Sequence, residues 1–111
     1  MKDTRIVITG MAINTPIGDT LDTFLNNLLD GKSAISRWKS VNCDKVYGKV
    51  GGDLGQYDIA AKVASYKDKI PQPIYARLLK LTKRFPKLMS ISLTTVVEAF
   101  LNANLLDRLD D

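Results

Sequence analysis

The run Ile6-Val7-Ile8 near the start of the chain constrains the fold more than any other stretch, because three consecutive β-branched apolar residues lead into Gly10. Residues of this type favour strands. A strand that is apolar at consecutive positions, rather than at alternate ones, is typical of a strand covered on both faces, as in a parallel or mixed sheet between helices. The run therefore predicts an α/β fold with this strand inside the sheet.

A tight turn and an amphipathic helix are predicted next. Pro16 and Gly18 favour the turn, and Asp19 and Thr20 are good N-cap residues for a helix. The apolar residues of the helix recur at i, i+3, i+4, i+7 and i+8, namely Leu21, Phe24, Leu25, Leu28 and Leu29. Gly31 is expected to end the helix in the usual C′ position. This apolar stripe needs a covering surface.

The remainder of the chain alternates between irregular and helical patterns. A short strand is predicted near residues 45–50 and a short helix over residues 59–66. Pro73 suits the first turn of a further helix, which Pro86 is expected to kink or split. The mostly apolar segment 88–106 predicts a buried helix, held by packing because its Thr and Val residues lower helix propensity.

The loop after the first strand does not fit a phosphate-binding loop. Gly10 and Gly18 stand eight positions apart, whereas a dinucleotide loop needs the closer spacing G-x-G-x-x-G. Pro16 also lacks a backbone N–H, and Asp19 follows Gly18 where a P-loop carries lysine. We expect no nucleotide cofactor, since a plain strand–loop–helix connection explains these residues.

Residue types that the chain lacks restrict its chemistry. It contains no histidine and one cysteine, Cys43. A Ser-His-Asp triad, a Cys-His pair and the usual zinc ligand sets are therefore excluded within it. Asp44 stands beside Cys43 and opposes thiolate formation, so a buried or incidental thiol is the preferred interpretation. No acid pair is marked as general acid and base, and we predict neither a catalytic residue nor a metal site.

The sequence also bears on location. It has no apolar run long enough to cross a membrane, no secretory signal pattern, and no second cysteine for an internal disulfide. A cytoplasmic protein is expected.

Positive charge is concentrated in one segment. The formal net charge of +4 is too small to indicate nucleic-acid binding. Five bases without an intervening acid nevertheless fall within eleven residues: Arg77, Lys80, Lys83, Arg84 and Lys87. The pattern indicates either a surface for an acidic partner or a solvated helix face.

Two stretches carry the motifs of a known family. The first, RIVITGMAINTPIGDTLDTFLNNLLDGKSAIS, is similar to R-V-V-V-T-G-x-G-x-x-S-P-x-G followed by a helix ending L-L-x-G-x-S-G-I. The second, KRFPKLMSISLTTVVEAFLNANLL, is similar to R-x-M-D-R-F…E-A-L-x-D-A-G-L. The residues in register are Arg5, Val7, Thr9, Gly10, Pro16, Gly18, Leu28, Leu29, Gly31, Ser33, Ile35, Lys83, Arg84, Glu98, Ala99, Phe100 and Leu105. The chain thus resembles the β-ketoacyl synthases of the elongating, acyl-carrier-protein-dependent type.

The resemblance covers nearly the whole chain, though only loosely over residues 38–76. Ala12 and Ala34 replace usual glycines and Pro86 replaces a usual acid, which suggests a divergent member. Members of this family are several times longer, and their nucleophilic cysteine, two histidines and catalytic lysine lie beyond the matched region. Residues 1–111 would thus form the N-terminal segment of a synthase N-terminal domain, inactive alone.

The resemblance implies a thiolase-like fold with layers α-β-α-β-α, of which this chain supplies an incomplete part. It further implies a homodimer, or a heterodimer with a ketosynthase. The implied reaction is decarboxylative Claisen condensation of acyl thioesters with malonyl thioesters, in fatty-acid or polyketide synthesis. Substrates are carried on the phosphopantetheine of an acyl carrier protein, without a further cofactor. Family members dock this acidic carrier on basic residues. Lys83 and Arg84 fall on matching positions, and Lys80 lies one turn before them.

Two other readings stay open. The chain could be a non-catalytic ketosynthase-like partner or truncated binding module, which lacks the catalytic cysteine and histidines, or a small α/β scaffold without a ligand. In either case the doubly apolar strand and the apolar helix call for layers on both sides. We expect the isolated chain to be marginally stable, oligomeric or aggregation-prone.

Overall fold

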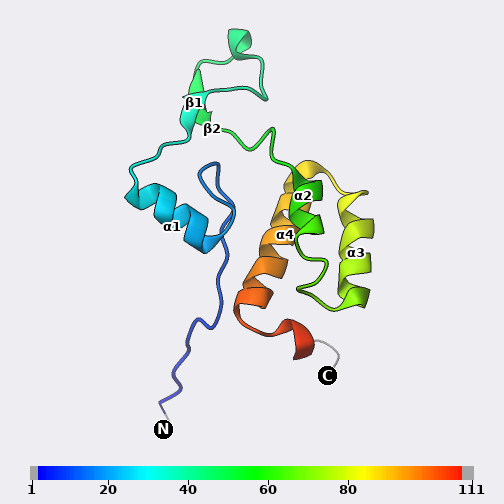
Figure 1. Ribbon diagram of the computed structural model, residues 1–111. Coiled ribbons are helices and arrows are strands. Elements are labelled where there is room, and N and C mark those ends of the chain that lie inside the picture. Colours follow the sequence, from blue (N-terminus) through cyan, green and yellow to red (C-terminus); the bar gives the residue numbers. More distant parts are fainter. Residues whose placement is uncertain (1–2, 109–111) are drawn as a thin grey trace. The chain divides into compact units, whose positions relative to one another are not determined.

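A computed structural model describes residues 3–108, which contain helices, one hairpin and two 3₁₀ turns (Figure 1). The elements are α1 (Leu21–Leu29), β1 (Ile35–Arg37), η1 (Cys43–Lys45), β2 (Val50–Gly52), α2 (Ile59–Ala64), α3 (Gln72–Thr82), α4 (Lys87–Asn102) and η2 (Leu106–Arg108). They belong to two units, each described by itself below. The central unit is Ile13–Ala60, and the terminal unit joins the chain before residue 13 to the chain from Ala61 onward.

Helix α1 of the central unit has the predicted boundaries, because local chemistry sets both ends. The Thr20 side chain caps the first turn by accepting the backbone N–H of Thr23 at 3.1 Å. Gly31 has a φ of 71°, and the N–H groups of Gly31 and Lys32 donate to the carbonyls of Leu28 and Asn27. This left-handed glycine C-cap satisfies carbonyls that the helix leaves open.

The strands of the central unit form a two-stranded antiparallel hairpin, with Ile35 opposite Gly52 and Arg37 opposite Val50. The second strand, β2, begins at Val50, where the strand predicted near residues 45–50 was expected to end. The start of that range belongs to η1, which ends at Lys45. The Trp38 ring lies against Gly51, where a Cβ atom would come within 2.3 Å of it. Glycine at this position therefore lets the indole cover the hairpin.

The first predicted strand is not formed within residues 3–108. Ile6, Val7 and Ile8 lie outside any regular element and are 94%, 71% and 81% exposed. A strand needs a neighbour to pair with its N–H and C=O groups, and the two described strands pair with each other in the hairpin. The mixed α/β class is confirmed, whereas the expected burial of this segment within the described chain is wrong.

The terminal unit contains α3, α4 and the larger part of α2. Helix α2 confirms the short helix predicted there, and Pro73 lies in the first turn of α3 as predicted. Pro86 splits the next helical region, because α3 ends at Thr82 and α4 begins at Lys87 with Pro86 as its N-cap residue. Helices α3 and α4 pack side by side as an antiparallel pair (Figure 1).

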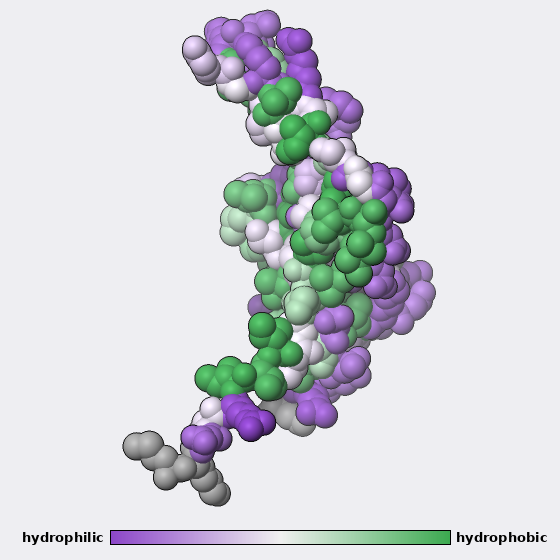
Figure 2. Space-filling view, turned by 90° about the vertical axis from the view of Figure 1, so that its left-hand side faces the viewer, coloured by the Kyte–Doolittle hydropathy of each residue, from purple (hydrophilic) through white to green (hydrophobic). Residues whose placement is uncertain are grey.

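Helix α4 buries one side only. Ser90, Thr94 and Val97 face the core, where Tyr66 and Val63 are each 1% exposed. On its other side Leu88 and Val96 are exposed, which corrects the prediction of a wholly buried helix. Hydrophobic residues are visible at the surface in Figure 2. Helix α1 likewise leaves most of its apolar stripe uncovered: Leu25, Leu28 and Leu29 are exposed, whereas Leu21 and Phe24 are partly buried. No helix within residues 3–108 is long and apolar enough to cross a membrane.

Gly10 anchors the first residues of the terminal unit to the end of α4. A Cβ atom at Gly10 would lie 2.5 Å from the Cβ of Ala103 and 2.7 Å from the Ala99 carbonyl oxygen. The neighbouring N–H of Met11 donates to the Asn102 side-chain oxygen at 3.1 Å. The close approach therefore requires the absence of a side chain at Gly10.

We predict that Gly10→Ala lowers the free energy of unfolding by about 1–3 kcal/mol, the usual cost of overpacking a close contact. Thermal denaturation followed by circular dichroism measures this loss. Gly48→Ala is the matched control, since nothing lies within 4 Å of a Cβ built at Gly48. Equal melting temperatures for the two variants would show that the contact does not hold the segment.

Candidate functional site

A depression on helix α3 brings together two of the three residues predicted to dock a partner. Lys80 and Lys83 line it with Arg77, over a volume of about 550 Å³. Ala76 and Leu79 supply the apolar part of its wall. Arg84 follows the C-cap residue of α3 and is exposed, outside the lining of this depression.

The local sequence explains why α3 presents cations there. Leu78 is buried. Because of helical geometry, Arg77 and Lys80 point away from the side of the helix that Leu78 occupies. Among the described residues, Arg77, Lys80, Lys83 and Arg84 form no ion pair with a carboxylate, and the sequence has no acid from residue 69 to residue 97. Cations near a helix C-terminus are favoured by the helix dipole. That effect explains part of the cluster without a partner.

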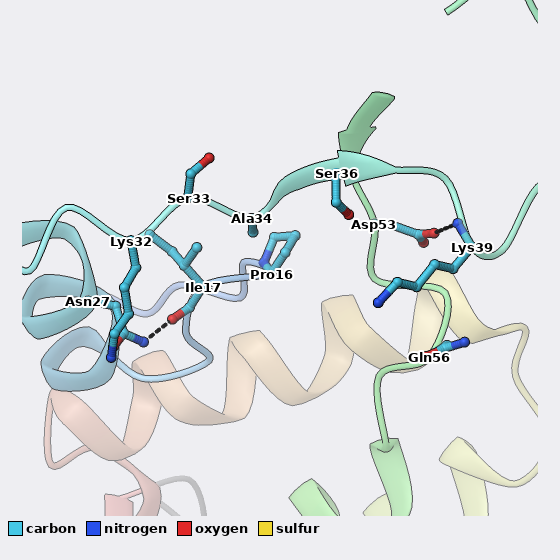
Figure 3. Close-up of a pocket in the computed structure, with 10 residues that line it drawn as sticks. All are labelled: Pro16, Ile17, Asn27, Lys32, Ser33, Ala34, Ser36, Lys39, Asp53 and Gln56. Carbon is cyan, nitrogen blue, oxygen red and sulfur yellow. Dashed lines mark hydrogen bonds between the residues drawn. The ribbon is translucent and has the colours of Figure 1, made fainter. Parts of the chain in front are cut away.

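A second hollow lies in the central unit, with a volume of about 520 Å³. Its lining residues are Pro16, Ile17, Asn27, Lys32, Ser33, Ala34, Ser36, Lys39, Asp53 and Gln56 (Figure 3). The Asn27 amide donates to the Ile17 carbonyl, and the Lys32 ammonium donates to the Asn27 side-chain oxygen at 2.8 Å. These polar groups are thus used in holding the loops that form the hollow.

Asp53 accepts four hydrogen bonds in this unit. Its carboxylate accepts the backbone N–H groups of Lys39 at 2.8 Å, Ser40 at 2.9 Å and Gly55 at 2.7 Å, and the Ser40 hydroxyl at 2.6 Å. These donors, the Ser40 hydroxyl first, hold the pKa of Asp53 well below its usual range. A carboxylate so fully occupied joins two loops and is a poor general base at neutral pH.

We predict that Asp53→Ala loosens the loops on either side of the hairpin, because four donors lose their acceptor. Trp38 is the single tryptophan, so a red shift of its emission reports the change. In the unsubstituted chain the contribution of Asp53 is fully present above the ordinary aspartate pKa of about 3.9. It is lost as the pH falls through the lowered pKa of the folded state.

Asp44→Ala is the control for this experiment, because Asp44 lies in the same region and its carboxylate accepts no hydrogen bond from residues 3–108. An Asp53→Ala variant whose Trp38 emission and acid transition match those of Asp44→Ala would contradict the assignment.

Cys43 is buried in η1, with its Sγ atom 3.5 Å from the Trp38 carbonyl oxygen and 3.6 Å from that of Val41. Both neighbours are acceptors for a thiol proton. The thiol of the sole cysteine can therefore donate a hydrogen bond here, and no side chain within residues 3–108 that could act as its base lies within hydrogen-bond distance of the sulfur. No group of three or more acidic or cysteine residues in the described part of the chain is arranged to hold a metal ion.

A buried ionisable cluster in the terminal unit escaped the sequence analysis. The Lys62 ammonium lies 3.2 Å from the Glu98 Oε2 atom, to which the Tyr66 hydroxyl donates at 2.5 Å. Lys62 also stands over the Tyr66 ring, 5.6 Å from its centroid. The spacing of Lys62 and Tyr66, four residues apart, was the only signal in the sequence. This cluster joins α2 and the residues after it to α4.

Comparisons with known proteins identify a family and a relative. A family described as "Beta-ketoacyl synthase, N-terminal domain" matches residues 3–110. The 3-oxoacyl-[acyl-carrier-protein] synthase II, chloroplastic, of Arabidopsis thaliana is 29% identical over 104 residues, which are 94% of this chain. The chain spans 17% of the length of that relative. No solved structure matches.

Proposed function

Because the chain belongs to the β-ketoacyl synthase family, whose N-terminal domain it matches over residues 3–110, we propose that it forms the first part of a 3-oxoacyl-[acyl-carrier-protein] synthase. The observation that carries this proposal is the match across nearly the whole chain, in agreement with the motifs at Gly10, Pro16, Gly18 and Gly31. In this role the chain supplies scaffold and a docking surface, as the N-terminal segment of a thiolase-like fold.

The proposed reaction is a decarboxylative Claisen condensation. A cysteine thiolate of the synthase takes the acyl group from the carrier thioester, and the carrier thiol leaves. The malonyl thioester then loses CO₂, and the resulting carbanion attacks the acyl carbonyl and displaces the cysteine. The chain holds no histidine and its one cysteine is buried. The reacting groups must therefore come from other residues of the synthase, and we expect no condensation by residues 1–111 alone.

Docking of an acidic carrier protein on Lys80, Lys83 and Arg84 is the direct role we propose for this segment. Two of these cations line the depression on α3, and none of the three is neutralised by a carboxylate within the described residues. Exposed charges of one sign raise the association rate of an oppositely charged partner and orient it. Each exposed contact contributes little on its own, so the cluster has to act together.

We predict that Lys80→Glu/Lys83→Glu/Arg84→Glu weakens binding of a holo acyl carrier protein by roughly 10- to 100-fold at low salt, the sum of three modest charge contacts. Isothermal titration or fluorescence anisotropy measures the dissociation constant. Lys45→Glu/Lys67→Glu/Lys69→Glu makes the same change of net charge at three other exposed lysines. Equal losses of affinity in both triple variants would contradict a specific docking site, because net charge alone would then explain the binding.

A second function is favoured by the residue types in the chain. The lack of histidine and the buried lone cysteine suit a non-catalytic subunit or binding module that pairs with a complete ketosynthase. Co-purification with such a synthase, stronger than binding to the carrier protein, would select this alternative. Dimer formation with a synthase chain is proposed in either case. A cytoplasmic location stays a prediction, and the chloroplast is named only for the Arabidopsis relative.

A further inference from the structure

The hollow of the central unit has a lysine at each of its two ends (Figure 3). Lys32 follows helix α1 at one end, and its ammonium donates to the Asn27 side-chain oxygen at 2.8 Å. Lys39 follows strand β1 at the other end, and its backbone N–H donates to Asp53 at 2.8 Å. Both lysines line the same space of about 520 Å³. A molecule that fills this space would therefore meet a positive charge at both ends.

Apolar side chains form the wall between the two lysines. Figure 3 shows them there, namely Pro16, Ile17 and Ala34. Contacts agree with this order, because the Ile17 carbonyl accepts the Asn27 amide at the first end. A Cβ atom at Gly52 would lie 3.4 Å from the Pro16 Cγ atom, which places Pro16 next to strand β2 at the second end. The hollow thus has an apolar middle between two charged ends.

Both ammonium groups can take a further partner. The Lys39 ammonium forms no hydrogen bond or ion pair within residues 3–108, and Figure 3 shows its side chain extended toward the middle of the hollow. The Lys32 ammonium is bonded to Asn27 and lies 3.7 Å from the Asp30 carboxylate, and both side chains of this ion pair are exposed. Because an ammonium has three donors, Lys32 keeps at least one donor for a ligand.

The single acid of the lining does not favour a cation in the hollow. The Asp53 carboxylate accepts four hydrogen bonds from the loops around it, so it has little capacity left to ligate a metal ion. The other charges of the lining are the two ammonium groups, which repel cations and attract anions. One ammonium at each end suits a singly charged carboxylate. Phosphate groups are typically held by a helix N-terminus or by arginine, and neither lines this hollow.

We propose that the hollow binds a small dicarboxylate, with one carboxylate on the Lys32 ammonium and the other on the Lys39 ammonium. The methylene chain between the two acid groups lies against Pro16, Ile17 and Ala34. This pairing of charges fixes both ends of the ligand, whereas a monocarboxylate can satisfy one end only. The site is separate from the basic cluster on α3 and does not rest on the proposed docking function.

Strand β1 supplies a matched control for the lysine that follows it. Ala34 and Ser36 line the hollow, and alternate residues along a strand point to the same face. Arg37 therefore points to the opposite face, and it does not line the hollow. Arg37 and Lys39 are both exposed, so Lys39→Gln and Arg37→Gln each remove one exposed positive charge. The Lys39 side chain has no bond to lose within the described residues, and its replacement should leave the fold intact.

The probes are succinate, glutarate and adipate, each paired with the monocarboxylate of equal carbon number: butanoate, pentanoate and hexanoate. They are titrated at constant ionic strength into the ¹⁵N-labelled chain, and nuclear magnetic resonance follows the backbone N–H signals of Ala34, Ser36 and Lys39. The signals of Arg77 and Lys80 serve as the reference for non-specific attraction of anions to exposed cations. Circular dichroism checks the fold of each variant.

We expect the best-fitting dicarboxylate to bind roughly two- to fivefold more tightly than its paired monocarboxylate, the usual contribution of one exposed charge contact. Arg37→Gln should keep this advantage, whereas Lys39→Gln should abolish it. Equal dissociation constants for paired di- and monocarboxylates in the unsubstituted chain would overturn the proposal. Equal losses in Arg37→Gln and Lys39→Gln, or signals of Arg77 and Lys80 that shift with the same affinity, would also overturn it, because general attraction to cations would then explain the binding.

Discussion

Replacement of Tyr66 by alanine is expected to lower the free energy of unfolding of the terminal unit by about 3–5 kcal/mol, the usual cost of removing a large aromatic ring from a core. Tyr66 is 1% exposed. Its hydroxyl donates to Glu98, and its ring lies beneath the Lys62 ammonium. Alanine would leave a cavity and would remove one hydrogen bond to a partly buried carboxylate. A loss of this size is a large share of the stability of a small domain.

Thermal and urea denaturation, followed by circular dichroism of the helices, measure this loss. Tyr47→Ala is the control, because Tyr47 is fully exposed and its replacement should stay within about 0.5 kcal/mol. Tyr66→Phe keeps the ring and removes the hydroxyl, which should cost about 1–3 kcal/mol. A Tyr66→Ala variant that unfolds like Tyr47→Ala would contradict the place of Tyr66 in the core.

Elements with boundaries set by local chemistry could be predicted from the sequence. Thr20 and Gly31 fix the two ends of α1, because one side chain caps the first turn and one backbone conformation closes the last. Pro86 likewise separates α3 from α4, since proline cannot continue a helix. None of these helix ends depends on contacts with residues far away in the sequence.

Features that depend on distant partners could not be predicted for this chain by itself. The apolar run Ile6–Ile8 has strand character, but the strand does not form where no neighbour pairs with it. The apolar residues of α4 likewise predicted a core helix, but nothing among the described residues covers its exposed side. Burial was thus predicted from residue type, although burial depends on what packs against the residue.

The candidate site was predicted in part. Lys83 and Arg84 were identified from the resemblance, and Lys80 from its position one turn before them. The structure places Lys80 and Lys83 in one depression. Arg77 belonged to the same basic cluster but lay outside the matched motif. Only the helix face shows that it lines the hollow and that Arg84 does not. The sequence indicates the hydrogen bonds of Asp53 only weakly, through an acid two residues before Gly55, a pattern that is typical of a turn.

Val7→Asp is expected to have little effect in the isolated chain and a large effect inside a complete synthase. In the isolated chain Val7 is 71% exposed, so the substitution should change the free energy of unfolding by less than about 0.5 kcal/mol. Inside a complete synthase we expect the segment to become a strand that is covered on both faces. An unpaired carboxylate there costs several kcal/mol, enough to prevent folding or to force protonation.

The most direct measurement uses a chimera in which residues 3–110 replace the matching segment of the Arabidopsis synthase. Thermal stability and condensing activity are compared for the chimera, its Val7→Asp variant and its Val7→Ile variant. We predict that the chimera and Val7→Ile fold and condense, while Val7→Asp loses stable folding although it leaves the isolated chain unchanged. A Val7→Asp chimera as stable and active as its parent would contradict the view that this segment is made to be enclosed by the rest of a condensing enzyme.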